Sequence, residues 1–422
     1  MEQSQPAQVS KVTIYGKMGS SIGYMIRDFL HRSDVPFEWI ELADDEDARR
    51  LAGVTLLNDN RLPVCVFADG TRMECPTVRQ ITEKLGWFHD PSRSQYDLAI
   101  YGAGPAGLSA AVYGASEGLT TILVERLAVG GQAGSSSKIE NYLGFPKGIN
   151  GAELAERARE QALRFGAELL LGREGVRGEF VPGKGVGYLG DGTKIVARSI
   201  ICATGVEYRR LNLSKEEKFL GAGVYYGAGA SEASLCGNEN VFVVGGGNSA
   251  GQAALHFSRF AETVTIVALE ETLRQSMSHY LIDRIQATPN IRVLTQTVVS
   301  ALEGDEILRE ISLTDCNTAQ QQTFATRWLF VCIGGVPHTD WAVEVGIQRD
   351  ASGYLITGPD LQLNGASSKS WPLDRNPYYL ETNVPGVFAA GDVRHGSVKR
   401  CASAVGEGAM AVTFVHRYLS AG

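Results

Sequence analysis

The sequence contains no C-x-x-C pair. Its seven cysteines are scattered along the chain, so it lacks both the spacing of a redox-active dithiol and that of a paired zinc ligand. This scatter also argues against a disulfide framework, and we expect a cytoplasmic protein without a bound metal. The cysteines are Cys65, Cys75, Cys202, Cys236, Cys316, Cys332 and Cys401.

Other features are missing too. No apolar run reaches the roughly 18 residues of a membrane span, and the polar start MEQSQPAQVS lacks the apolar core of a signal peptide. The net charge of −8 argues against general binding to nucleic acid or to an anionic membrane. We therefore expect no membrane span and no nucleic-acid partner.

The chain is rich in glycine, with 49 among 422 residues, and long enough for two to four domains of about 100–200 residues each. Its most informative stretch is residues 98–125, LAIYGAGPAGLSAAVYGASEGLTTILVE. Short apolar runs at residues 98–101 and 121–124 predict buried parallel strands, and the small residues 105–116 predict a helix between them. The stretch therefore predicts a β-α-β unit.

Gly102, Gly104 and Gly107 give this unit the spacing G-x-G-x-x-G. In such a turn the first glycine permits the tight bend, the second lets a pyrophosphate approach the backbone, and the third lets helix and strand pack closely. Glu125 ends the second strand, near the spacing of about 20 residues expected for a carboxylate that binds a ribose hydroxyl.

The pattern occurs again at residues 241–250, VFVVGGGNSA, where Gly245, Gly247 and Ala250 form G-x-G-x-x-A. An apolar strand predicted over residues 264–269 is followed by Glu270. The chain therefore contains two predicted dinucleotide units.

Between and after these turns lie GGQ at residues 130–132, IEN at 139–141, ATG at 203–205 and GVFAAGDV at 386–393. In this order, over about residues 96–420, the motifs resemble those of the low-molecular-weight thioredoxin reductases. The resemblance implies FAD at the first unit and NADH or NADPH at the second. The cofactor-binding residues that it implies are Gly102, Gly104, Pro105, Ala106, Gly107, Glu125, Arg126, Gly131, Gln132, Asn141, Ala203, Thr204, Gly205, Gly245, Gly247, Asn248, Ser249, Ala250, Glu270, Gly391, Asp392, Lys399, Arg400 and Ala402.

The sequence departs from that family at two places. Where the family has paired arginines for the 2′-phosphate of NADPH, this chain has Leu269 and Glu270, and only Arg274 matches a later arginine. We therefore expect NADH to be favoured. Where the family has its C-x-x-C pair, alignment places Gly227 and Ala230, so we predict no catalytic residue of that kind.

Residues 9–88 resemble a glutaredoxin, a small thioredoxin-fold protein, with strands predicted at 11–15, 37–42 and 61–67 and helices at 21–32 and 76–85. Pro63 stands where that family has a cis-proline. Its two cysteine positions align with Ser20 and Gly23, which cannot exchange disulfides because the thiolate is the nucleophile. We expect this domain to be inactive in redox chemistry.

The predicted fold class is α/β: a thioredoxin-like domain followed by two Rossmann-like dinucleotide-binding domains. The predicted boundaries are 1–90 for the degenerate glutaredoxin-like domain, 96–212 and 336–422 for the FAD domain, and 213–335 for the NAD(P)-type domain. Residues 359–379 form an insertion relative to the family, which the sequence leaves open as a lid, a partner site or a long loop.

Three functions are consistent with these features. The first is an FAD-dependent NAD(P)H oxidoreductase whose acceptor is not a dithiol, such as a quinone, an iron–sulfur protein or another flavoprotein. The second is a disulfide reductase that uses thiols supplied in trans or an unrecognised cysteine. The third is a non-catalytic flavin-bound sensor or scaffold. We expect a homodimer whose electron acceptor, if a protein, docks on the N-terminal domain.

Overall fold

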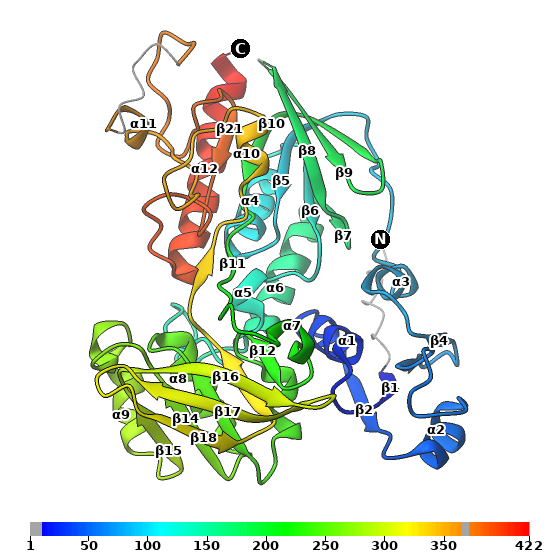
Figure 1. Cartoon of the computed structure of the whole chain (residues 1–422). Helices are drawn as coiled ribbons and strands as arrows, with labels where there is room; N and C mark the ends of the chain where they lie inside the picture. Colours follow the sequence, from blue (N-terminus) through cyan, green and yellow to red (C-terminus); the bar gives the residue numbers. More distant parts are fainter. Residues whose placement is uncertain (1–10, 182, 364–370, 422) are drawn as a thin grey trace. The chain divides into compact units, whose positions relative to one another are not determined.

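A computed structural model of the chain describes residues 11–421, apart from residue 182 and residues 364–370 (Figure 1). The described chain divides into two compact units and passes between them several times. The first unit contains the residues up to Ile81, Ser135–Ser137 and Tyr208–Gly334; the second contains Thr82–Gly134, Lys138–Glu207 and the residues from Gly335 onward. The first glycine turn therefore lies in the second unit, and the second turn lies in the first.

The second unit is built on one mixed sheet. Its order is β7 (Glu168–Leu171), β6 (Thr121–Glu125), β5 (Tyr96–Tyr101), β10 (Lys194–Cys202), β9 (Lys184–Leu189) and β8 (Gly175–Val181), and β21 (Val387–Ala389) also pairs with β10. The strands from β7 to β10, together with β21, run parallel, whereas β9 and β8 continue the sheet antiparallel. The predicted strands at residues 98–101 and 121–124 are confirmed. Their apolar runs are long because parallel strands are covered on both faces.

Three long helices pack in this unit: α4 (Pro105–Ser116), α6 (Gly151–Arg164) and α12 (Cys401–Ala421). The predicted helix over 105–116 is confirmed at both ends. Helix α12 lies along α4 (Figure 1). The two helices approach closely because Gly408 faces Ala106, whose carbonyl oxygen a Cβ on Gly408 would overlap. The short helices of this unit are α5 (Gly131–Gly134), α10 (Trp341–Glu344) and α11 (Asp360–Leu363).

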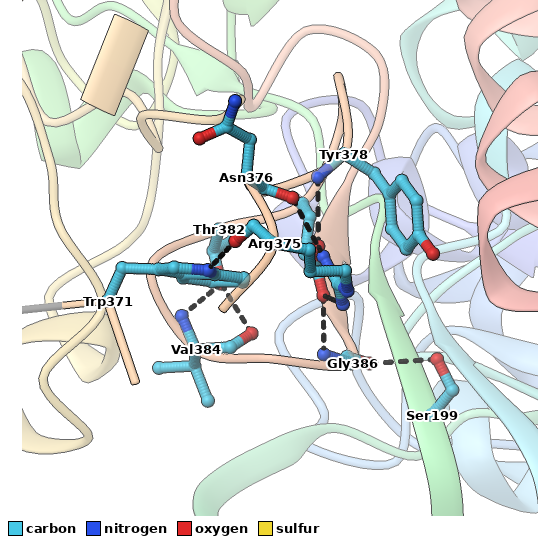
Figure 2. A network of polar contacts seen from close by, with 9 residues as sticks. Ser199, Trp371, Arg375, Asn376, Tyr378, Thr382, Val384 and Gly386 are labelled. Atoms are coloured by element: carbon cyan, nitrogen blue, oxygen red, sulfur yellow. Dashed lines mark hydrogen bonds and ion pairs between the residues drawn. The ribbon is translucent and has the colours of Figure 1, made fainter. Parts of the chain in front are cut away.

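The insertion falls partly outside the described residues, at 364–370, and its C-terminal part is tied to the sheet (Figure 2). Arg375 donates from its Nη1 and Nη2 atoms to the fully buried Glu381 carboxylate, at 2.6 and 2.9 Å. The same carboxylate accepts the backbone N–H groups of Tyr378 and Gly386, and the Gly386 carbonyl accepts from Ser199 on β10. This bonding fixes the chain immediately before β21.

The first unit contains a parallel sheet with the order β12 (Val224–Tyr226), β19 (Trp328–Val331), β13 (Asn240–Val244), β14 (Thr263–Val267) and β15 (Ile291–Leu294). An antiparallel sheet follows, of β16 (Thr297–Gly304), β17 (Leu308–Asp315) and β18 (Gln321–Ala325). The helical segments are α7 (Glu216–Phe219), η1 (Ala230–Leu235), α8 (Asn248–Phe257), η2 (Leu273–Gln275) and α9 (His279–Gln286). Short strands β11 (Glu207–Tyr208) and β20 (Gly335–Val336) lie where the chain passes between the units. The predicted strand at 264–269 is confirmed as β14.

The first unit also contains the N-terminal sheet, with the order β2 (Phe37–Glu41), β1 (Val12–Gly16), β3 (Val64–Val66) and β4 (Arg72–Glu74). Its helices are α1 (Ser21–Arg32), α2 (Asp45–Ala52) and α3 (Val78–Lys84). The strands predicted at 11–15 and 37–42 and the helix at 21–32 are confirmed within one residue. The strand predicted at 61–67 is shorter, since only Val64–Val66 form β3, and the helix predicted at 76–85 is α3. The Leu62–Pro63 bond is cis. Helix α2 and strand β4 were not predicted. Helix α2 is highly charged, with three acidic residues in its first turn, and it buries only Ala48 and Ala52.

Two half-buried histidines lie near each other in the first unit, His31 on α1 and His256 on α8. The pKa of His256 falls from 6.5 to about 4, chiefly because of burial and in smaller part because of the charges of Arg259 and His31. Burial also lowers the pKa of His31, against the opposing effect of Asp28 and Asp34. Both rings are therefore held neutral in the folded protein.

This arrangement predicts acid sensitivity. The unfolded chain binds a proton at His256 below pH 6.5, but the folded chain does so only near pH 4, so the stabilisation present above pH 6.5 is lost as the pH falls toward 4. We expect His256→Gln to reduce the fall in the free energy of unfolding over this interval by on the order of 2 kcal/mol, allowing for partial exposure. Urea unfolding at several pH values measures this, with the exposed His279→Gln as the matched control. An equal fall in both variants contradicts the prediction.

Candidate dinucleotide-binding sites

The turn between β5 and α4 has no room for side chains at two of its glycines. Gly102 has φ +102°, and a Cβ there would overlap the carbonyl oxygen of Ala203. A Cβ on Gly107 would overlap the carbonyl oxygen of Gly102. At Gly104, by contrast, a Cβ would meet nothing nearer than the Cα of Gly131 at 4.0 Å. Side chains are therefore sterically excluded at Gly102 and Gly107, whereas Gly104 borders free space.

The N-terminus of α4 is uncapped and accessible to an anion. Its N-cap is Gly104, no side chain caps it, and Pro105 begins the helix. The first N–H groups of a helix have no partner within the helix, and the positive end of its dipole lies there, so this end attracts an anion. Because Gly104 adds no side chain, an anion can approach these N–H groups.

Glu125 lies beside this turn at the end of β6. Its carboxylate accepts the backbone N–H of Ala103 at 2.8 Å and that of Leu127 at 2.8 Å. These bonds fix its orientation, and a carboxylate oxygen can accept more than one hydrogen bond, so it can also receive a ribose hydroxyl. The next residue, Arg126, is partly exposed and pairs with Glu174 and Glu207 at 3.6 and 2.6 Å.

The fold brings distant predicted residues to the same turn. Gly131 lies against Gly104, since a Cβ on Gly131 would be 3.1 Å from the Cα of Gly104. Gly391 has φ +80°, and a Cβ there would be 2.9 Å from that of Ala106. The amide of Gln132 donates to the carbonyl of Val206 at 2.8 Å, directly after the ATG motif. Segments far apart in sequence therefore meet around the start of α4.

Asp392 follows Gly391 and is largely buried. Burial raises the pKa of its carboxyl group above the ordinary value, while a hydrogen bond from Ser397 at 3.3 Å opposes this rise. The loop is held by Glu407, whose carboxylate accepts the Gly391 N–H at 2.7 Å and pairs with Arg394 at 2.6 Å. Sequence reasoning missed Glu407. Its signal was a lone carboxylate in the small-residue stretch AVGEGA of α12.

The remaining predicted residues of the second unit are more exposed. Ala203 is buried, Thr204 is exposed, and Gly205 has φ +67°. Asn141 and Ala402 are also exposed. Lys399 donates from Nζ to the Tyr354 hydroxyl at 2.6 Å, and Arg400 donates to the Lys399 carbonyl at 3.0 Å. Lys399 is therefore bonded to a distant segment of the same unit, whereas Arg400 is bonded within its own loop.

The second turn, between β13 and α8, has the same glycine geometry as the first turn. Gly245 has φ +132°, and a Cβ there would overlap the carbonyl oxygen of Cys332. Ala250 is fully buried, whereas a Cβ on Gly247 would have no atom within 4 Å. Gly247 is the N-cap of α8, and no side chain caps this helix. This helix end can also receive an anion.

Two polar side chains frame the second turn. Asn248 donates to the Ser278 hydroxyl at 3.0 Å and accepts the Ser278 N–H at 2.7 Å, so it fixes the loop, whereas Ser249 is exposed. Glu270 lies over Gly246, where a Cβ would overlap its carboxylate, and it accepts from the Ser276 hydroxyl at 3.3 Å. A carboxylate therefore borders the turn where the ribose of a nucleotide would lie.

The place aligned with the family's first cysteine is filled by a ring. Gly227 has φ +93°, and a Cβ there would overlap the hydroxyl oxygen of Tyr208. That hydroxyl is 3.2 Å from the Ser135 hydroxyl. The nearby thiol of Cys332 donates to the Gly227 carbonyl at 3.4 Å, and burial raises its pKa to about 12. This thiol is protonated at neutral pH and is a poor nucleophile.

Two β-α turns of dinucleotide-binding type, one in each unit, define a two-nucleotide oxidoreductase. Comparison with known proteins agrees. Residues 96–408 match the pyridine nucleotide-disulphide oxidoreductase family, and the chain belongs to this family of FAD-dependent oxidoreductases. Residues 1–95 lie before the matched region.

The relatives are thioredoxin reductases. The chain is 35% identical over 328 residues to the enzyme of Bacillus subtilis and 33% identical over 327 residues to that of Treponema pallidum, covering 77% of this chain and 95% and 98% of those proteins. The crystal structure of Lactococcus lactis thioredoxin reductase matches with a TM-score of 0.69 at 29% identity, over 78% of this chain and all of that one. No described helix is long and apolar enough to cross a membrane.

The open space at Gly104 generates a prediction. The protein itself has room for a side chain there, so Gly104→Val should fold normally yet lose most of its bound FAD, because the branched side chain occupies the approach to the helix end. Absorbance of the purified protein measures the flavin content. Gly190→Val is the matched control, since Gly190 is exposed and its nearest neighbour is a Val176 methyl group at 3.5 Å. Full flavin content in Gly104→Val would refute this assignment.

Proposed function

We propose that the protein transfers hydride from a nicotinamide nucleotide to FAD and passes the electrons to an acceptor that is not a dithiol. The observation that carries this proposal is the pairing of two dinucleotide turns, each open at its second glycine, with the absence of a C-x-x-C pair from the sequence. Flavin supplies the chemistry when bound, because it accepts a hydride and can release electrons singly or in pairs.

The proposed roles of the domains follow the predicted boundaries. Residues 96–212 and 336–422 form the FAD domain, 213–335 the nicotinamide-nucleotide domain, and 1–90 a degenerate glutaredoxin-like domain. The strand order β2-β1-β3-β4 supports the thioredoxin-like interpretation of residues 1–90. We further propose a homodimer in the cytoplasm, which light scattering of the purified protein and fractionation of cells test.

The proposal assigns a separate role in FAD binding to each residue around the first turn. The start of α4 holds the FAD pyrophosphate, Glu125 accepts from a ribose hydroxyl, and Asp392 accepts from hydroxyl groups of the cofactor. Gln132 and Asn141 line the flavin. Support comes from the convergence of Gly131, Ala203 and Gly391 on the first turn.

The same proposal assigns the start of α8 and Glu270 to the nicotinamide nucleotide. Glu270 lies over the second turn, and Gly247 leaves the helix end open. Electrons then leave the flavin without a protein thiol. Three observations support this: the ring of Tyr208 against Gly227, the positive φ of Gly227, and the raised pKa of Cys332.

Anaerobic stopped-flow mixing with NADH tests the proposal. We expect rapid bleaching of the flavin by stoichiometric NADH, no long-wavelength charge-transfer band from a thiolate beside the flavin, and reoxidation by quinone or ferricyanide. Absence of bleaching favours the non-catalytic sensor. Turnover with thioredoxin disulfide, faster than with ferricyanide, favours a disulfide reductase that uses thiols in trans.

Cysteine alkylation gives a second prediction. Burial raises the pKa of the Cys65 and Cys202 thiols to about 12 and that of Cys401 to about 11, whereas Cys316 is exposed. Alkylation of the folded protein with N-ethylmaleimide should therefore modify Cys316 first and leave NADH–ferricyanide turnover unchanged. Peptide mass mapping identifies the modified thiols, and Cys316→Ser is the control. Loss of turnover with retention of FAD assigns a redox role to a cysteine and contradicts the proposal.

The position of Glu270 predicts a preference for NADH. A carboxylate accepts hydrogen bonds from the ribose hydroxyls but repels a 2′-phosphate, and close like charges cost on the order of 1 kcal/mol even in water, enough for a several-fold preference. We expect Glu270→Arg to reverse the ratio of kcat/KM for NADH and NADPH. Glu271→Arg, the exposed neighbour, is the control. A wild-type preference for NADPH refutes this assignment.

A further inference from the structure

Helix α1 presents a buried cation to η1, the segment that begins at Ala230, the second of the two positions aligned with the family's dithiol. The exposed fractions of Arg27 and Glu232 are 4% and 0%. The guanidinium donates from Nε to Oε1 at 3.1 Å and from Nη2 to Oε2 at 2.8 Å. Charged side chains are rarely buried to this extent unless they are paired, so each of these residues depends on the other.

An aromatic side chain on β2 packs against the guanidinium group of Arg27. The guanidinium of Arg27 lies 4.0 Å from the centre of the Trp39 ring. That ring lies against Gly23, where a Cβ would be 3.2 Å from it. Ser20 caps α1 by accepting the Gly23 N–H at 3.0 Å. The two positions aligned with glutaredoxin cysteines therefore serve a different purpose, since one caps α1 and the other leaves room for the ring beneath Arg27.

Backbone contacts also bring α1 close to the segment that precedes η1. A Cβ on Gly221 would be 2.9 Å from the Cα of Ser21, and Gly221 has φ +69°, so this approach requires glycine. The rings of Tyr24 and Tyr225 meet edge to face with their centres 5.0 Å apart. Helix α1 therefore contacts the segment of residues 221–235 at Gly221, Tyr225 and Glu232. We call this segment the η1 face.

We infer that residues 11–81 are a permanent occupant of the η1 face and thereby exclude any second protein from it. The face includes Gly227 and Ala230, where the resemblance places the missing dithiol. The occupied face and the absent thiols belong together, because a domain fixed at Gly221, Tyr225 and Glu232 restricts the approach of a disulfide protein to this segment. A protein acceptor must dock elsewhere on the chain. This inference holds whatever the acceptor is, so it is independent of the proposed function.

Reversal of the buried charges in the full-length, flavin-loaded protein tests the contact. Arg27→Glu places two carboxylates together, and Glu232→Arg places two guanidinium groups together. We expect each single variant to raise amide hydrogen exchange in both α1 and η1 by about tenfold or more, as expected for local opening. The double variant Arg27→Glu/Glu232→Arg should return the exchange toward the wild-type rate, because the opposite charges face each other again.

The matched control is Arg309→Glu, which reverses one charge of the exposed pair Arg309–Asp305 in the same unit and should leave α1 and η1 unchanged. Exchange in β13 and β14 serves as the internal reference. Two results overturn the inference: unchanged protection of α1 and η1 in both single variants, or an equal rise in β13 and β14, which indicates unfolding of the whole unit rather than release of a bound domain.

Exclusion itself is tested with a reporter thiol at Ser231→Cys, an almost isosteric change beside Glu232, to which Ser231 donates at 3.3 Å. We expect slow modification by a bulky polyethylene-glycol maleimide when Arg27 is present and at least about tenfold faster modification in Arg27→Glu, as local opening admits it. N-ethylmaleimide measures the intrinsic reactivity of the same thiol, and peptide mapping separates it from the native cysteines. Equal rates with the bulky reagent in both chains show an accessible face and overturn the inference.

Discussion

The close backbone contact between Gly107 and the carbonyl oxygen of Gly102 positions α4 against β5, and the rest of the second unit depends on it. Because α4 lies so near the sheet, its uncapped N-terminus faces the space beside Gly104. Helix α12 approaches α4 as closely through Gly408, and the loop at Gly391 meets Ala106. Protein interiors are close-packed, so a methyl group at any of these contacts displaces an element. The space beside the start of α4 therefore depends on glycines, whose lack of a side chain lets the surrounding elements pack closely.

At Gly23 and Gly227 the lack of a side chain leaves space that an aromatic side chain occupies. The ring of Trp39 lies against Gly23, and the hydroxyl of Tyr208 lies against Gly227. Among the native thiols, burial raises the pKa of Cys65, Cys202 and Cys332 to about 12, so these three are protonated at neutral pH. The thiolate is the reactive form.

The buried pair Arg27–Glu232 contributes specificity more than net stability. Removing two charges from water costs about as much as their attraction returns, but breaking such a pair costs about 3–5 kcal/mol because one charge stays buried alone. The two hydrogen bonds between Arg27 and Glu232 are directional, so they favour the observed placement of α1. The pair therefore selects a single arrangement of the N-terminal domain on η1, while Tyr24 and Tyr225 add apolar contact.

The sequence by itself determined the local elements and the dinucleotide turns. Residues 105–116 were predicted as a helix and form α4 with those bounds, because glycine spacing and apolar runs act over a few residues. Tertiary structure alone decided which distant residues meet. Arg27 and Glu232 are 205 positions apart, and neither stands in a recognisable motif. Glu407 reaches the Gly391 N–H only because α12 packs along α4. Such contacts depend on how whole elements pack, and a local pattern does not record the partner of a charge.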